Sequence, residues 1–84
     1  MIFGVVEDES ARPLEGAVVF IVSGTSAFRD IAALTNTRGE YGLSGMPEGS
    51  YEISAMLDGY VSASNTVEVR SEPCQHNFTL KRKV

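Results

Sequence analysis

The sequence predicts an all-β protein, a seven-stranded antiparallel β-sandwich of two sheets with Greek-key connections. Its apolar residues come in short runs that glycine and proline interrupt roughly every ten residues, which is the pattern of such sandwiches. No window of about a dozen residues keeps the apolar spacing of a helix with capping residues at its ends. The 84 residues are enough for one small domain, which the predicted strands and turns fill from residue 1 to residue 84.

The first three predicted strands lie in the N-terminal half. Residues 2–6 are a β-branched and aromatic run, and the polar segment 7–13 ends it as a turn. Residues 17–22 are apolar almost without interruption, which predicts a central strand that is buried on both faces. Residues 28–37 are harder to assign because their apolar stretch 31–34 suits either a strand or one helical turn, and we favour a strand.

Four further strands are predicted where apolar and polar residues alternate, because successive side chains of a strand point to opposite faces of its sheet. The residues expected on the inner faces are Tyr41 and Leu43, then Tyr51, Ile53 and Ala55, then Val67 and Val69, and finally Phe78 and Leu80. Turns separate these strands at Gly39, at residues 45–49 and at residues 58–60. Gly39 stands where a hairpin turn needs a positive φ.

Charge and composition exclude several classes of function. The formal net charge of −4 argues against a nucleic-acid partner, because binding phosphates needs clustered Lys and Arg. The basic run at residues 81–83 is interpreted as a solvated chain end. The N-terminal residues lack a basic start, a long apolar stretch and a cleavage site, so neither a signal peptide nor a membrane span is expected in this chain. That leaves a cytoplasmic protein or a domain of a longer one.

Few residues suggest chemistry. Cys74 and His76 lie two positions apart and share a face of a predicted strand, but a nucleophilic pair or a zinc site needs further partners. Cys74 also has no second cysteine with which to form an internal disulfide. The carboxylates at residues 7–9, Asp30 and Asp58 lack the ordered spacing of a calcium loop. We therefore predict no catalytic residue, no metal site and no cofactor.

Contact surfaces are expected where the loops of a sandwich gather at its two ends. Four large apolar residues fall near predicted loops and are candidates for contact with a ligand or partner: Phe28, Met46, Met56 and Tyr60. The edge strands of an open sandwich also present unpaired backbone groups. A weak homodimer through edge strands is therefore a further expectation.

An ordered series of turn and core residues runs through nearly the whole chain. It comprises Gly4-Val5-Val6 with Asp8, Pro13-Leu14-Glu15-Gly16-Ala17 with Val19, Thr35-Asn36-Thr37-Arg38-Gly39-Glu40-Tyr41 with Leu43, Met46-Pro47 with Gly49, Tyr51, Ile53 and Ala55, and Gly59-Tyr60. This series resembles the carboxypeptidase regulatory-like domain, a transthyretin/prealbumin-like, Ig-like β-sandwich found as an accessory module. The resemblance implies a non-catalytic spacer or protein-docking module of a cell-surface or secreted protein, in contact with a protein partner or neighbouring domains and located outside the cytoplasm.

Two relatives of this fold suggest other functions. The transthyretin-related hydroxyisourate hydrolases use several histidines and a C-terminal Tyr-Arg-Gly-Ser, whereas this chain has one histidine and ends Lys81-Arg82-Lys83-Val84. Their activity is therefore not implied. Starch-binding-like modules bind glycans through exposed aromatic residues, usually tryptophan, which this chain lacks. A carbohydrate-binding accessory domain nevertheless stays the alternative. A third possibility, an enzyme, would need Cys74 and His76 within hydrogen-bonding reach, with a third polar group orienting the histidine.

Overall fold

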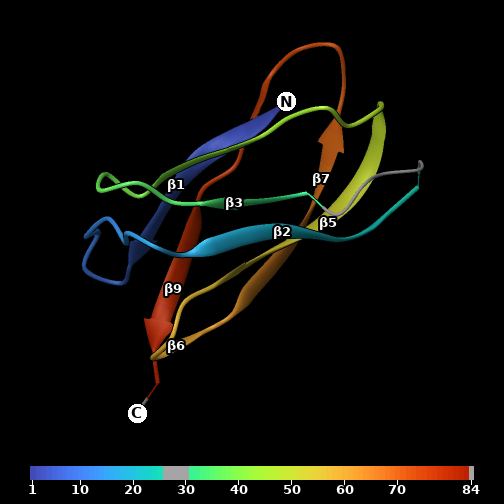
Figure 1. Cartoon of the computed structure of the whole chain (residues 1–84). Coiled ribbons are helices and arrows are strands. Elements are labelled where there is room, and N and C mark those ends of the chain that lie inside the picture. Colours follow the sequence, from blue (N-terminus) through green and yellow to red (C-terminus); the bar gives the residue numbers. More distant parts are fainter. Residues whose placement is uncertain (26–30, 84) are drawn as a thin grey trace.

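A computed structural model describes residues 1–25 and 31–83, and it confirms an all-β sandwich of two sheets (Figure 1). The described residues form nine strands: β1 (Ile2–Asp8), β2 (Val18–Gly24), β3 (Ala32–Leu34), β4 (Glu40–Leu43), β5 (Gly49–Met56), β6 (Tyr60–Val61), β7 (Ala63–Val69), β8 (Cys74–Gln75) and β9 (Phe78–Arg82). One sheet has the order β4-β1-β9-β6, with β8 also paired to β1, and the other has the order β3-β2-β5-β7.

The strand number differs from the predicted seven because β6 and β8 contain only two residues each. Such short strands carry no alternation that a sequence pattern could reveal, and pairing with distant segments alone defines them. Strand β6 pairs with β9, and β8 pairs with β1. The ambiguous segment 31–34 does contain a strand, β3, while residues 28–30 of the predicted element lie outside the described residues.

The sequence pattern predicts antiparallel pairing throughout, but the structure also contains parallel pairs. Strand β1 pairs in parallel with both β8 and β9, and in Figure 1 β1 (blue) and β9 (red) both run downward side by side. A tight hairpin imposes antiparallel pairing on neighbouring strands, but no hairpin joins β1 to β9. The chain enters β8 and β9 only after crossing from β7 in the opposite sheet, so the two ends of the chain can run in the same direction.

The core lies between the inner faces of the two sheets. Its residues come from both sheets and match the predicted inward positions: Tyr41, Leu43, Tyr51, Ile53, Ala55, Val67, Val69, Phe78 and Leu80 are all buried. The hydroxyl groups of the two buried tyrosines reach backbone acceptors, since Tyr51 donates to the carbonyl of Pro47 (2.6 Å) and Tyr41 donates to that of His76. Both tyrosines therefore contribute apolar area without leaving a buried donor unpaired.

The prediction that residues 17–22 are buried on both faces is wrong. Strand β2 is an inner strand of its sheet, but only Val19 and Ile21 point into the core. Val18 and Val22 are exposed, because none of the described residues forms a helix or a further sheet over the outer face of β2. An apolar run of this kind is expected for a strand covered on both sides, so the exposed positions need another explanation.

Candidate protein-contact site

Three large aliphatic side chains lie in one row across the outer face of the β3-β2-β5-β7 sheet. Val18 on β2 is the direct cross-strand partner of Leu34 on β3 and of Met56 on β5. Their exposed fractions are 36% for Val18, 69% for Leu34 and 48% for Met56. Single exposed apolar residues are common on protein surfaces, whereas adjacent ones form an apolar patch, and large patches mark sites of contact with a protein or a ligand. We call these three residues the aliphatic row.

The apolar surface continues along β2 beyond the aliphatic row. Phe20 follows two residues after Val18, and its cross-strand partners are the small residues Ala32 and Ser54. Ser54 is buried although it is on the outer face, and its hydroxyl donates to the carbonyl of Ala63 (3.2 Å). Val22 is exposed at the register shift between β2 and β5. The outer face of β2 is therefore apolar over most of its length.

A hollow of about 390 Å³ adjoins one end of the aliphatic row, where β5 turns toward β6. Val18 and Met56 line it together with Leu57 and Tyr60, and the charged groups of Asp58 and Lys83 also face it. Tyr60 is the cross-strand partner of Arg82 on β9, and interaction with the tyrosine hydroxyl raises the pKa of the Arg82 guanidinium.

Acidic residues border the other end of the apolar surface. Glu52 is two residues beyond Ser54 on β5, and its carboxylate accepts a hydrogen bond from the Ser23 hydroxyl (3.5 Å). Glu68 on β7 lies farther along the same outer face and forms an ion pair with Arg70 (3.2 Å). This face therefore combines an aliphatic centre with a carboxylate border.

The structure brings together two of the four predicted contact residues. Met56 belongs to the aliphatic row, and Tyr60 lines the adjoining hollow. Met46 is elsewhere, in the loop between β4 and β5, where it is partly buried against the core. Phe28 lies outside the described residues.

Sequence reasoning missed Val18 and Leu34. Both fall inside predicted strands, and their alignment with Met56 in one row depends on the pairing of three separate strands. The available signal was the length of the apolar run at residues 17–22, since a strand with one solvated face needs an apolar residue only at every second position.

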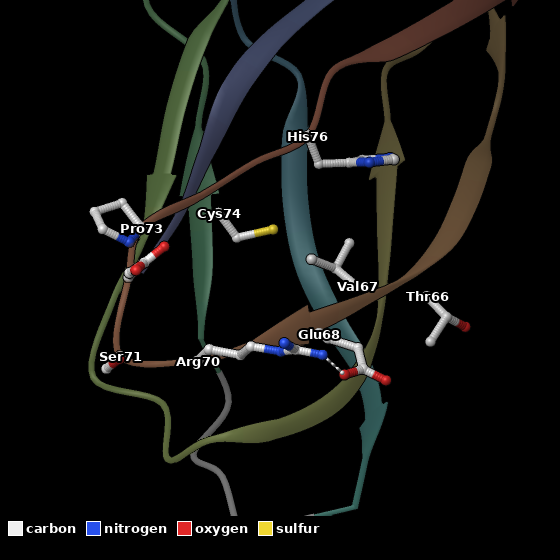
Figure 2. Close-up of a pocket in the computed structure, with 9 residues that line it drawn as sticks. Thr66, Val67, Glu68, Arg70, Ser71, Pro73, Cys74 and His76 are labelled. Carbon is white, nitrogen blue, oxygen red and sulfur yellow. Dashed lines mark hydrogen bonds and ion pairs between the residues drawn. The ribbon is translucent and has the colours of Figure 1, made fainter.

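A second cavity, of about 590 Å³, lies between β7 and the segment that follows it, and Cys74 and His76 both project into it (Figure 2). The His76 ring packs edge-on against Phe78, with 4.9 Å between ring centroids. Its Nε2 atom is 3.2 Å from Oδ1 of Asn65, and its backbone N–H donates to the carbonyl of Phe3 (2.8 Å). These contacts hold His76 in place.

The residues around this cavity do not form a recognisable reactive site in the described part of the chain. No hydrogen bond between Cys74 and His76 is found among the described residues, and Cys74 is half-buried against the core. Burial raises the pKa of the nearby Tyr41 hydroxyl, which keeps it a neutral donor to the carbonyl of His76. The described residues also contain no group of three or more His, Cys, Asp and Glu side chains that could hold a metal ion.

No helix in residues 1–25 and 31–83 has the length and apolar character that crossing a membrane would require. No curated protein is significantly similar in sequence to this chain.

Solved structures of several proteins share the fold. A chain of the type II cohesin–X-dockerin complex Coh3ScaB-XDoc_M1ScaA from Acetivibrio cellulolyticus superposes with a TM-score of 0.76 at 16% identity, covering 96% of this chain and 56% of that one. This chain thus spans about half the length of that protein. The 5-hydroxyisourate hydrolase of Klebsiella pneumoniae gives a TM-score of 0.71 at 15% identity, covering 99% of this chain and 91% of that one. At such identities the likeness concerns the fold alone.

The match at the level of sequence is to a domain family. The model of the carboxypeptidase regulatory-like domain matches residues 1–81, nearly the whole chain, so this chain belongs to the carboxypeptidase regulatory-like domain family.

Proposed function

We propose that this chain is a non-catalytic docking module that binds a protein partner, or a neighbouring domain of a longer protein, through the outer face of its β3-β2-β5-β7 sheet. The observation that carries the proposal is the aliphatic row, in which Leu34, Val18 and Met56 are in register and exposed together. Water is a poor environment for such a row, and burying one aliphatic side chain in full contributes about 1.5–3 kcal/mol. Covering the row would therefore stabilise a complex.

The comparisons support this proposal at a general level. Carboxypeptidase regulatory-like domains are accessory modules, and one structural neighbour is a chain of a type II cohesin–X-dockerin complex. The resemblance to carboxypeptidase regulatory-like domains also supports a location outside the cytoplasm, and we therefore extend the proposal to a cell-surface or secreted protein.

Site-specific cross-linking would test the docking function. A photoreactive amino acid would replace Val18 in the natural full-length protein in its own cells, and we expect one defined protein or intramolecular adduct. The matched position is Thr79, which is exposed on β9 of the opposite sheet. An adduct that forms equally from both positions, or from neither, would contradict the proposal.

A second substitution makes the test specific for the aliphatic row. Leu34→Glu should abolish the adduct from position 18, because it places a charge beside Val18 and removes the most exposed member of the row. Thr37→Glu adds the same charge at an exposed position outside the strands and should leave the adduct unchanged.

The carbohydrate alternative gains no specific support. A glycan-binding face would present a row of exposed aromatic rings, whereas the large exposed apolar side chains among the described residues are aliphatic: Met1, Val18, Val22, Leu34, Met56 and Val61. Binding of sugars therefore stays a prediction that no observation favours over protein contact.

A further inference from the structure

We infer that the free edge of β7 binds an extended peptide segment of a partner protein, which pairs with β7 as an additional strand and places an apolar side chain beside Cys74 and His76. This site is separate from the outer face proposed above and does not depend on it. Three features of the described residues support the inference: an unpaired strand edge, a cavity along that edge, and an opening into the sandwich at the same place.

Among the described strands, β7 offers the longest free edge. It has seven residues, and its pairing with β5 runs through seven consecutive residue pairs without a register shift. An antiparallel neighbour uses the N–H and C=O groups of every second residue, so the other residues direct theirs away from β5. In the described part of the chain, residues 64–69 make no backbone hydrogen bond outside this ladder. A further strand can therefore pair with them.

The cavity of about 590 Å³ at Cys74 and His76 lies along this edge (Figure 2). On one side it is lined by three successive residues of β7, which are Thr66, Val67 and Glu68. Successive side chains of a strand point to opposite faces of the sheet, so a space that touches all three borders the edge of the strand rather than one face. We call this space the edge groove, and its volume is within the range of about 300–1,000 Å³ found for ligand pockets.

The sandwich is open toward its core at the edge groove. Asn65 belongs to the inner face of its sheet, because its direct cross-strand partner Ile53 is buried in the core. Asn65 is nevertheless exposed, and its side chain lies 3.2 Å from the ring of His76 across the opening. A side chain that points inward from an added strand could therefore enter here.

The inner wall of the edge groove suits an apolar side chain. Val67 is buried, and Cys74 is half-buried against the core with its thiol directed across the groove toward β7 (Figure 2). The two charged side chains Glu68 and Arg70 at the groove form an ion pair with each other (3.2 Å). In strand addition, main-chain hydrogen bonds provide affinity and pockets for alternate side chains provide specificity. The edge of β7 and the edge groove supply these two elements side by side.

A free extended segment fits this site better than a second copy of the chain. Two paired β7 strands would satisfy the backbone groups, but Val67 and Val69 of the second copy are buried in its own core and could not enter the groove. The formal charge of −4 on each copy also opposes their pairing at pH 7. A helix cannot pair with the edge, because its own N–H and C=O groups bond within the helix.

Protection of Cys74 from a thiol reagent would test the inference, since Cys74 is the one cysteine of the chain and projects into the groove. The probe is a soluble peptide of about eight alternating valine and threonine residues, with lysine at each end, added at pH 7. A saturating concentration should slow the reaction at least about tenfold, because the peptide covers the thiol. In the double variant Cys74→Ser, Thr79→Cys the thiol is moved to an exposed position on β9, and the peptide should leave its reaction unchanged.

N-methylation of the peptide distinguishes strand pairing from binding of side chains alone. Two derivatives carry N-methyl groups at alternate residues, one in each frame, so each loses the donors of one edge and keeps every side chain. The derivative methylated on the edge that faces β7 should bind at least about tenfold more weakly than the parent peptide, and the other should bind about as well. In NMR spectra of the isotope-labelled protein, the parent peptide should shift the amide signals of Thr66, Val67 and Glu68.

Several outcomes would overturn the inference. No protection of Cys74 by the parent peptide would contradict binding at the groove, and equal binding of the parent and both derivatives would contradict strand pairing. Protection that rises with the concentration of the protein alone at pH 7 would identify a second copy as the occupant. The cross-link from position 18 tests the outer face by itself, so failure of one proposal leaves the other standing.

Discussion

At the scale of single residues, Gly39 shows how closely the turn before β4 packs against its neighbours. Its φ is +73°, and a Cβ atom at this position would meet the carbonyl oxygen of Val6 and, at 3.1 Å, the backbone nitrogen of Leu14. We therefore expect Gly39→Ala to lower the free energy of unfolding by more than about 2 kcal/mol, since strain in φ and a backbone clash add together. Urea denaturation of the two proteins would measure the difference.

Gly59→Ala is the matched control for this substitution. Gly59 also has a positive φ, +86°, but no atom lies within 4 Å of the position of its Cβ. The substitution should cost about 1–2 kcal/mol from the backbone conformation alone. Equal losses for the two alanine variants would show that the close approach at Gly39 contributes nothing.

At the scale of elements, Thr35 joins the segment before β2 to the segment after β3. Its buried hydroxyl donates to the carbonyl of Leu14 (2.6 Å) and accepts the backbone N–H of Ala17 (2.9 Å). Thr35→Val keeps the shape of the side chain and leaves both backbone groups without this partner. We expect a loss of about 2–4 kcal/mol in the free energy of unfolding, which thermal or urea denaturation would measure.

Two further substitutions distinguish the hydrogen bonds from general sensitivity at this site. Thr35→Ser retains the hydroxyl and should recover most of the stability lost in the valine variant. Thr37→Val changes an exposed threonine two residues away and should alter stability by no more than about 0.5 kcal/mol. A valine variant as stable as the unsubstituted protein, with the serine variant less stable than both, would show that packing of the methyl group, rather than hydrogen bonding, holds these segments together.

The elements also show how far sequence patterns determine this structure. Alternation in residues 51–55 predicts the inward side chains of β5 correctly, because burial on one face leaves a local signature. Strands β6 and β8 leave none, since they exist only through pairing with distant segments. The aliphatic row was missed for the same reason. Met56 could be suggested from its place near a turn, but its neighbours Val18 and Leu34 depend on a register that spans three strands.

At the scale of the whole molecule, the two free edges of the β3-β2-β5-β7 sheet differ in what they offer to another copy. Strand β7 is an edge strand of seven residues whose register with β5 is unbroken, and it contains neither lysine nor proline. The opposite edge of the same sheet, β3, has only three residues. Proteins usually protect long edges with lysine, proline or bulges, because unpaired backbone groups can accept a further strand. Any pairing of two copies through edge strands is thus expected at β7.

Net charge opposes this pairing at neutral pH. Each copy carries a formal charge of −4 at pH 7, and the repulsion disappears near the isoelectric point of about 4.8. We therefore expect weak association in sedimentation experiments that strengthens as the pH falls toward that value. Thr66→Lys places a charge in the middle of β7 and should suppress the association, whereas Thr79→Lys makes the same change in net charge on an inner strand of the other sheet and should suppress it less. Equal effects of the two lysines would assign the association to net charge alone and would remove β7 as the interface.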